Sequence, residues 1–213
     1  MNLYKFKHYY KNKYLLTPFS KRRFALSYNY KYKCLWFRTP KVGSRSINQY
    51  FLDSTPKDEY IYSSEVSYNS SDFKDWYKFA FVREPTDRFI SCWKDKVLNR
   101  NFFGFAPEQY EEMKTLDNFL SWVEEQNIDE AEEHIRSQNA LIDLDNLNFL
   151  GRLENFESDM QKVADSIGMP LQKVHRKNTS GKKEVNLTEL QRNRIAKIYA
   201  KDYELLYPTN ATP

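Results

Sequence analysis

Two short segments of the chain carry residue types that bind phosphate groups. The first, TPKVGSRS (residues 39–46), supplies a lysine, three hydroxyl groups and a glycine that lets the backbone approach a ligand closely. The second, FAFVREPTDRFIS (residues 79–91), has Arg83 at the end of an apolar run and Ser91 about two helical turns further on. A guanidinium and a hydroxyl placed in this way can bind one phosphate together.

The first segment differs from the loop that binds nucleoside triphosphates. That loop has the pattern GxxxxGK[ST], in which the lysine follows the glycine, whereas Lys41 precedes Gly43 in this chain. A nucleotide triphosphatase and a nucleoside or sugar kinase are therefore disfavoured. Taken alone, each segment is also compatible with a structural role, either a turn with a solvated lysine or a helix capped by an arginine. Their occurrence together favours a phosphorylated nucleotide as the ligand.

The elements that must position these segments alternate along the chain. Apolar runs predict strands at residues 34–38, 60–63, 78–83 and 148–153. Helical spacing predicts helices at 44–52, 85–98, 116–125, 131–142 and 156–167, and a last helix that begins at a capping box of Thr188 and Gln191. This alternation predicts an α/β fold with a central parallel sheet flanked by helices on both faces. Ligands of such sheets bind beyond the carboxyl ends of the strands, where both segments lie.

The composition is that of one globular domain over residues 1–213. Hydrophobic residues make up 40% of the chain and aromatic residues 16%, which is enough for a sizeable core. No stretch has the pattern of a signal peptide or of a membrane span, and Cys34 and Cys92 lie in apolar runs that favour buried thiols. We therefore expect a cytoplasmic protein without a membrane span. The sequence carries no signal for an oligomeric state.

The charge is unevenly distributed, with twelve Lys or Arg residues and no acidic residue before Asp53. Residues 1–33 interleave these cations with aromatic side chains, a pattern that suits nucleic acid, a membrane surface or a covering role on the domain. We favour the covering role. The alternative function is a polyanion-binding or nucleic-acid-binding module without catalysis, which would bind in a salt-dependent way and turn nothing over.

The two segments resemble, in the same order, the 5′-phosphosulfate loop and the 3′-phosphate motif of sulfotransferases that use 3′-phosphoadenosine-5′-phosphosulfate (PAPS). The carbohydrate sulfotransferase branch is the most similar, because EHIRSQ (133–138) and FLGRLENFESD (149–159) also resemble its pattern. The similarity spans about residues 34–207. It implies a single-domain, three-layer, P-loop-like fold, PAPS as the donor co-substrate, no metal, no nucleic-acid partner and a hydroxyl-bearing acceptor that we expect to be a carbohydrate.

The resemblance also implies roles for individual residues. Lys41 corresponds to the lysine at the phosphosulfate bridge, and Arg83 and Ser91 correspond to the residues that bind the 3′-phosphate. The residues that would surround the 5′-phosphate are Val42, Gly43, Ser44, Arg45 and Ser46. Arg45 stands where the family usually has threonine, so its contact with either nucleotide or acceptor is open.

Sulfuryl transfer also needs a base that takes the proton of the acceptor hydroxyl. Relatives commonly place this base near the end of the second strand, where Glu65 follows YIYSS, so Glu65 is the first candidate. His134 in EHIRSQ is the second, because imidazole titrates near neutral pH. His8 and His175 have weaker claims.

Two further segments could contribute to the site or serve the fold alone. The loop HRKNTSGKK (175–183) could close over the nucleotide through Lys177 or Lys182, or it could be solvated. Arg152 and Glu154 could be active-site groups or a structural ion pair.

Overall fold

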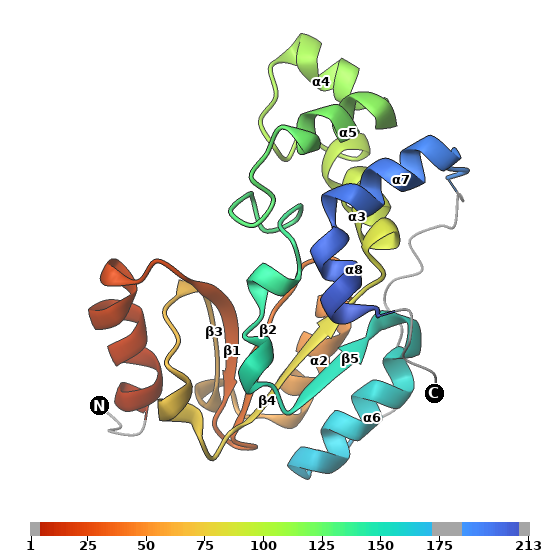
Figure 1. Ribbon diagram of the computed structural model, residues 1–213. Coiled ribbons are helices and arrows are strands. Elements are labelled where there is room, and N and C mark those ends of the chain that lie inside the picture. The colour runs from red at the N-terminus through yellow and green to blue at the C-terminus, as the bar shows by residue number, and fades with distance from the viewer. Residues whose placement is uncertain (1–4, 172–184, 209–213) are drawn as a thin grey trace. The chain divides into compact units, whose positions relative to one another are not determined.

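The computed structural model describes residues 5–171 and 185–208. These residues form two compact units (Figure 1). The first contains residues 5–39, 43–82 and 141–171, and the second contains 40–42, 83–140 and 185–208. The predicted loop 175–183, with His175, Lys177 and Lys182, lies outside the described residues.

A five-stranded sheet with the order β3-β1-β2-β4-β5 organises the first unit. Its strands are β1 (Phe24–Asn29), β2 (Cys34–Phe37), β3 (Tyr60–Val66), β4 (Tyr77–Val82) and β5 (Phe149–Arg152). The neighbours β2, β4 and β5 are parallel, as the alternating pattern predicts. The carboxyl ends of β2 and β4 are also tied together, because the Thr39 hydroxyl donates to the carbonyl of Phe81 at 2.5 Å.

The prediction of a wholly parallel sheet is wrong, because β1 pairs antiparallel with both β2 and β3. Only residues 30–33 join β1 to β2, with Lys33 at a φ of 47°. So short a connection makes a hairpin, since a parallel pair needs a crossover of a dozen or more residues. β1 itself was not predicted, because it lies in the N-terminal segment whose cations and aromatics obscure the strand pattern. The sheet is therefore mixed.

One face of the sheet packs against two helices, α2 (Ser44–Ser54) and α6 (Phe156–Ile167). Side chains alternate between the faces of a strand, so Phe79 and Phe81 of β4 point to the same side. The ring of Phe79 lies 6.0 Å from that of Phe51 in α2, and the ring of Phe81 lies 5.6 Å from that of Phe156 in α6. Both helices therefore cover this face.

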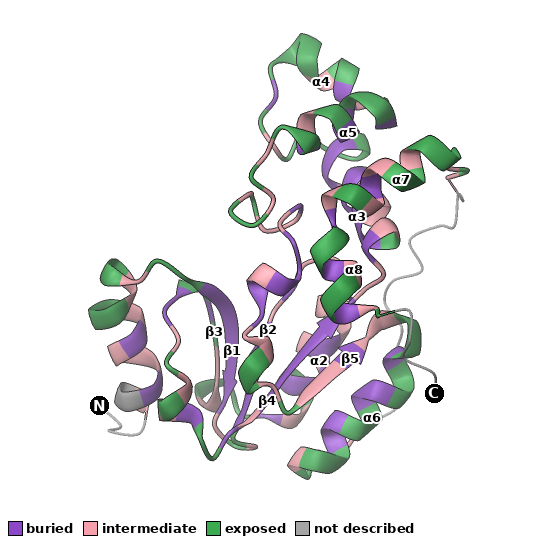
Figure 2. Cartoon of the chain, viewed as in Figure 1, coloured by how far each residue is buried: buried purple, intermediate pink, exposed green. Residues whose placement is uncertain are grey.

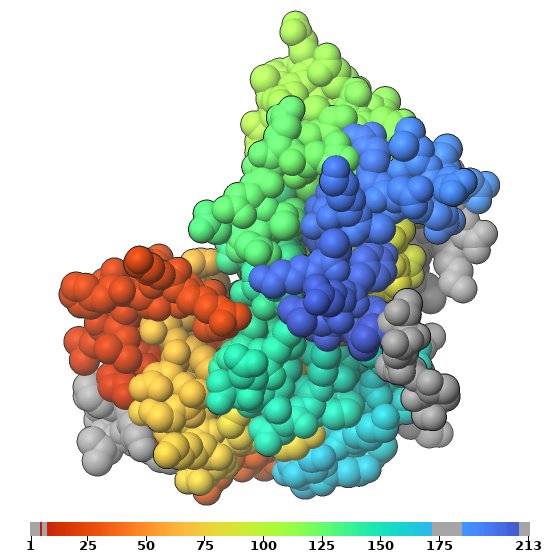
Figure 3. All heavy atoms as spheres, viewed as in Figure 1, coloured from red at the N-terminus to blue at the C-terminus, as the bar shows by residue number. Residues whose placement is uncertain are grey.

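The other face is covered by the N-terminal segment and by residues before β4. Tyr28 of β1 lies 5.5 Å from Tyr9 of the π-helical segment η1 (Phe6–Leu16) and 5.9 Å from Phe73 of η4 (Ser70–Phe73), measured between ring centroids. β1 is buried along its whole length (Figure 2). The outer side of η1 and of η2 (Thr17–Phe19) faces solvent (red in Figure 3), and Phe19 is 88% exposed. The first unit thus has three layers.

Helices make up most of the second unit. They are α3 (Pro85–Trp93), η5 (Lys94–Leu98), α4 (Pro107–Met113), α5 (Leu116–Glu124), α7 (Glu189–Ile198) and α8 (Ala200–Leu206). Phe89 of α3 is buried between Phe119 of α5, with ring centroids 5.4 Å apart, and Tyr199, at 6.3 Å. The capping box of Thr188 and Gln191 starts α7 as predicted. Among the described residues, no helix is both long enough and apolar enough to cross a membrane.

The helix predicted over residues 131–142 is wrong. The segment forms turns and ends in one 3-10 turn, η6 (Asn139–Leu141). Carboxylates replace the helical acceptors here: Glu132 accepts from the backbone N–H of His134, and Asp202 accepts from the backbone N–H groups of Gln138 and Asn139. These bonds satisfy the backbone N–H groups although the segment is not helical. Other 3-10 turns are η3 (Lys57–Glu59), η7 (Leu144–Asn146) and η8 (Leu153–Asn155).

Both cysteines are buried free thiols, as their apolar surroundings predict. Burial raises the pKa of Cys92 to about 12 and raises that of Cys34 as well. The protonated thiol is therefore the form present at neutral pH, so these side chains act as small core residues.

We predict that Gly151→Ala in β5 destabilises the first unit. A Cβ added at Gly151 would lie 2.6 Å from a ring carbon of Phe81, which is too close for any real contact. Overpacking of this kind costs about 1–3 kcal/mol in the free energy of unfolding. Urea unfolding monitored by fluorescence measures it. The control is the same change in a Phe81→Leu background, where the smaller side chain should remove most of the cost.

Candidate active site

The start of α2, in the first unit, carries the residues predicted to surround a 5′-phosphate. Gly43 has a φ of 80°, a left-handed conformation that favours glycine, and its carbonyl accepts from the N–H groups of Ser46 at 2.9 Å and Ile47 at 3.3 Å. The Ser44 hydroxyl donates to the carbonyl of Thr39 at 2.8 Å, which holds the loop against the end of β2. The first N–H groups of a helix have no intrahelical acceptor, so this turn can bind an anion. Arg45 is exposed on the same turn.

Gly43 is also required by packing. A side chain there would meet Leu153 at 3.0 Å and the ring of Phe156 at 3.6 Å, in addition to the strain of its positive φ. The glycine therefore allows α2 to begin against the start of α6, whose first turn carries Phe156. The residue predicted to let the backbone approach a phosphate is thus also the residue that the fold needs.

Lys41 belongs to the second unit, where its ammonium pairs with Asp95. The Nζ to Oδ2 distance is 3.1 Å, and the Lys41 backbone is left-handed with a φ of 71°. Burial lowers the pKa of Lys41, although hydrogen bonding to Asp95 opposes the shift. The charged lysine is therefore held in a partly desolvated place, where its interaction with an anion is stronger than in water.

Asp95 is surrounded by three cations. Besides Lys41, the side chains of Lys96 and Arg100 each lie 3.6 Å from its Oδ2. Burial by itself would raise the pKa of Asp95, but these cations, Lys41 first, lower it overall. One carboxylate therefore balances only part of the positive charge gathered around it, and the excess favours an anionic ligand.

Arg83 and Ser91 lie at the end of β4 and on α3, both in the second unit. The backbone of Arg83 is clamped by the Gln138 amide, which accepts from its N–H at 2.9 Å and donates to its carbonyl at 2.8 Å. Gln138 is held in turn by the buried carboxylate of Asp202 in α8. The Arg83 guanidinium is 25% exposed and lies 3.8 Å from Asp87. Its backbone is thus fixed while its charged group reaches solvent.

Arg88 is a structural residue of this site that the sequence motifs did not reveal. It is only 2% exposed, and its guanidinium donates to the backbone carbonyls of Pro40 at 3.1 Å, Arg136 at 2.9 Å and Glu133 at 3.0 Å. It therefore joins the residue before Lys41 to the turn that carries His134. Its position among the buried residues of α3, next to Phe89, is the one signal that could have identified it.

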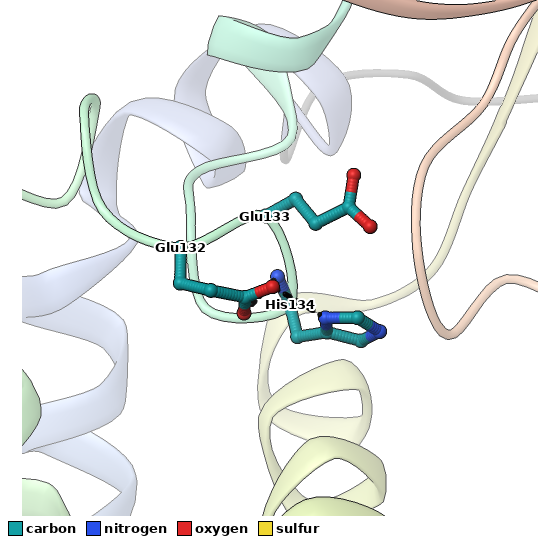
Figure 4. Close-up of side chains that lie close together, drawn as sticks. All are labelled: Glu132, Glu133 and His134. Carbon is teal, nitrogen blue, oxygen red and sulfur yellow. Dashed lines mark hydrogen bonds and ion pairs between the residues drawn. The ribbon is translucent and has the colours of Figure 1, made fainter. Parts of the chain in front are cut away.

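His134 lies in that turn with its ring held by Glu132 (Figure 4). The Nδ1 of the ring is 2.8 Å from one carboxylate oxygen of Glu132, and the backbone N–H of His134 donates to the other, also at 2.8 Å. The ring of Phe102 packs edge-on against the imidazole at 4.9 Å. The second unit thus contains four of the predicted site residues, namely Lys41, Arg83, Ser91 and His134.

Glu65 belongs to the first unit and lies in a bulge of β3. Two steps along β1, from Phe24 to Leu26, match three along β3, from Val66 to Ser63. Glu65 takes up the extra residue with a φ of 50°, and its side chain is exposed. A left-handed non-glycine residue is strained, and such strain concentrates at functional positions.

In the first unit, Arg152 is the last residue of β5, and Glu154 lies in the 3-10 turn η8 that follows. The N–H of Arg152 donates to the carboxylate of Asp159 at 2.9 Å, so Asp159 closes the turn between β5 and α6. The final aspartate of the FLGRLENFESD pattern, Asp159, therefore has a structural role in this turn.

We predict that Arg88→Ala strongly destabilises the protein. The change removes a buried guanidinium and leaves three backbone carbonyls without their donors, so the free energy of unfolding should fall by about 3–5 kcal/mol. Urea unfolding measures this loss. Arg192→Ala, which removes an exposed arginine of α7, is the control and should stay within about 0.5 kcal/mol of the parent. A loss of less than 1 kcal/mol in Arg88→Ala would contradict the role described for this side chain.

We predict that the positive φ of Glu65 costs stability, and that the cost depends on the residue placed there. Glu65→Gly should leave the free energy of unfolding unchanged or raise it by up to about 1 kcal/mol, because glycine accepts a positive φ. Glu65→Val, with a branched side chain at the same φ, should lower it by about 1–2 kcal/mol. Thermal and urea unfolding compare the two variants. If glycine is the more damaging of the two, the side chain of Glu65 stabilises the bulge instead of straining it.

One of the comparisons with known proteins gives a match. A model described as the sulfotransferase family matches residues 25–208, a range that contains both segments predicted to bind phosphate and also His134. Comparison with curated proteins and with solved structures gives no significant match. A mixed five-stranded sheet flanked by helices is consistent with the family fold. Because the matched range covers most of its length, the chain belongs to the sulfotransferase family.

Proposed function

We propose that this chain moves a sulfuryl group from PAPS to a hydroxyl group of a carbohydrate acceptor. The observation that carries the proposal is the placing of Lys41 in the second unit: its ammonium is partly buried, oriented by Asp95 and accompanied by Lys96 and Arg100. Family membership supports sulfuryl transfer, and the two phosphate-binding segments support PAPS as the donor. The carbohydrate acceptor rests on the resemblance of EHIRSQ and FLGRLENFESD to that branch.

The residues present suit a nucleotide that carries several phosphate charges. The helix start at Gly43 to Ser46 offers backbone N–H groups and hydroxyls in the first unit, and the second unit offers Lys41, Arg83 and Ser91. Arginine binds phosphate through two parallel donors, whereas lysine acts as a compact point charge. Arg83 therefore suits a terminal 3′-phosphate, and Lys41 suits the bridge between phosphorus and sulfur.

The reaction is a displacement at sulfur. The acceptor oxygen forms a bond to sulfur, the bond from sulfur to the bridging phosphate oxygen breaks, and 3′-phosphoadenosine-5′-phosphate (PAP) leaves with the electron pair of that bond. Negative charge develops on the bridging oxygen, where the Lys41 ammonium would stabilise it. The acceptor hydroxyl loses its proton to a base, for which Glu65 and His134 are the candidates.

Lys41 has to exchange partners for this role. Its Nζ pairs with Asp95 at 3.1 Å, so a bound phosphosulfate would compete with that carboxylate for the ammonium. Because Lys96 and Arg100 also lie 3.6 Å from Asp95, the carboxylate keeps two cations when Lys41 turns to the donor. The exchange therefore leaves no bare carboxylate behind.

We predict that PAP binds and that ATP and AMP bind far more weakly in calorimetric titrations. Arg83→Ala should weaken PAP binding by about 10- to 100-fold, since a hydrogen bond to a charged group contributes about 1.5–3 kcal/mol. With PAPS and an acceptor, Lys41→Ala should lower turnover by about 10²- to 10³-fold. Lys197→Ala removes an exposed lysine of α7 and is the matched control, expected to change neither quantity.

The outcome distinguishes the proposal from a polyanion-binding module. If PAP does not bind, and heparin binds in a way that weakens steeply with salt, the basic N-terminal segment is the functional surface and the sulfotransferase proposal fails. Tight PAP binding that Arg83→Ala leaves unchanged would mean that a different residue holds the 3′-phosphate. Radiolabelled donor and a panel of oligosaccharides then identify the acceptor.

A further inference from the structure

Glu132 and His134 form a pair joined at two points. One oxygen of the Glu132 carboxylate lies 2.8 Å from Nδ1 of the imidazole, and the other accepts the backbone N–H of the same histidine at 2.8 Å. A single hydrogen bond would leave the ring free to turn about its side-chain bonds. The second bond fixes the backbone from which the ring extends, so the carboxylate determines both the place and the orientation of the imidazole.

The state of the carboxylate determines which ring nitrogen carries the proton. Burial alone would raise the pKa of Glu132, but its hydrogen bonds from His134 outweigh burial and lower it. Glu132 is therefore ionised at neutral pH and can only accept, so the neutral imidazole must carry its hydrogen on Nδ1. Figure 4 shows the ring with Nδ1 turned to Glu132 and Nε2 at the opposite end. The lone pair of a neutral ring is then on Nε2.

The surroundings hold this pair in place and connect it with Lys41. The ring of Phe102 packs against the imidazole at an interplanar angle of 67°, and the ammonium of Lys96 lies 4.0 Å from the centre of the Phe102 ring. Lys96 also lies beside Asp95, the partner of Lys41. All these residues belong to the second unit, whereas Glu65 belongs to the first.

Glu133 carries a second carboxylate close to the pair. Glu132, Glu133 and His134 bring one potential ligand atom each within 4.8 Å of one another. However, one oxygen of Glu132 already bonds to Nδ1 of His134, and the other already accepts the backbone N–H of the same histidine. We therefore treat Glu132 and His134 as a hydrogen-bonded pair, with the carboxylate of Glu133 beside it. Figure 4 draws hydrogen bonds between Glu132 and His134 only.

We propose that Glu132 is a positioning residue that keeps His134 in the Nδ1–H form, so that Nε2 takes the proton of the acceptor hydroxyl. This inference rests on the proposed sulfuryl transfer. As the acceptor oxygen bonds to sulfur and the sulfur to phosphate-oxygen bond breaks, the hydroxyl proton moves to Nε2. The imidazolium that forms keeps its Nδ1 hydrogen bond to the ionised carboxylate, which stabilises the positive charge. Glu132 itself does not take up the proton.

The first test reads the tautomer directly in the protein without donor. The chain has three histidines, His8, His134 and His175, so the ring signals are few and His134→Asn assigns the one of interest. In ¹H–¹⁵N correlation spectra at pH 8, the parent should show His134 protonated at Nδ1. Glu132→Ala should convert the signal to the Nε2–H form or to a mixture of the two. Glu133→Ala, the matched control, should leave it as in the parent.

The second test measures turnover with PAPS and an acceptor. Glu132→Ala should lower kcat by about 10- to 100-fold, within the range that general base catalysis contributes, and should leave the KM for PAPS unchanged. Glu132→Gln keeps an oxygen acceptor for Nδ1–H and should restore part of the loss. Glu133→Ala should stay within about threefold of the parent, because the hydrogen bonds of the pair join Glu132 to His134 and do not use the Glu133 side chain.

The results separate the failure of this inference from failure of the proposed function. The inference would be overturned if the parent shows His134 protonated at Nε2, or if Glu132→Ala leaves the tautomer of the parent unchanged. Either result would overturn it even if PAP binds and PAPS is turned over. Full turnover in His134→Asn together with its loss in Glu65→Gln would also overturn it and identify Glu65 as the base. Absence of PAP binding in the parent would instead overturn the proposed function.

Discussion

The burial of one guanidinium is the constraint on which the second unit depends. Arg88 is almost fully enclosed, and its guanidinium bonds to three backbone carbonyls. A buried charge is costly unless its donors are satisfied, so the segments that supply those carbonyls must take up one arrangement. Those segments lack regular secondary structure, and the guanidinium provides the connections that a helix or sheet would otherwise supply. Lys41 and His134 are next to two of these segments, and their positions follow from the same requirement.

A second level of control is electrostatic. Asp95 orients Lys41 and shares its charge with Lys96 and Arg100, so the cluster is anchored yet keeps an excess of positive charge. Glu132, also a carboxylate, orients the imidazole of His134 in the same way. A carboxylate that orients a neighbouring side chain places it before a ligand arrives, which lowers the cost of ordering that side chain on binding.

In the first unit, the sheet supports helix α2 and the turn at Gly43 from which it starts. Aromatic side chains from β2 and β4 pack under α2, and Thr39 joins the ends of the two strands. Gly43 meets two demands at once, since both its positive φ and the closeness of Leu153 exclude a side chain. A residue fixed by the fold in this way gives the loop a definite shape at the place where the motif predicts a phosphate.

The sequence alone determined the local elements and the types of chemistry. Hydrophobic spacing and caps identified β2, β4, β5, α2, α5, α6 and the start of α7, because these patterns arise from neighbours along the chain. The motifs also singled out Lys41, Arg83, Ser91 and the two candidate bases. Only the tertiary structure showed that β1 also pairs antiparallel with β3, which lies about 30 residues further along the chain. It also showed that residues 131–142 are not a helix, since Asp202, distant in sequence, satisfies part of their backbone. It also revealed the contacts of Arg88 with Pro40 and of Asp95 with Lys41, which no local spacing encodes.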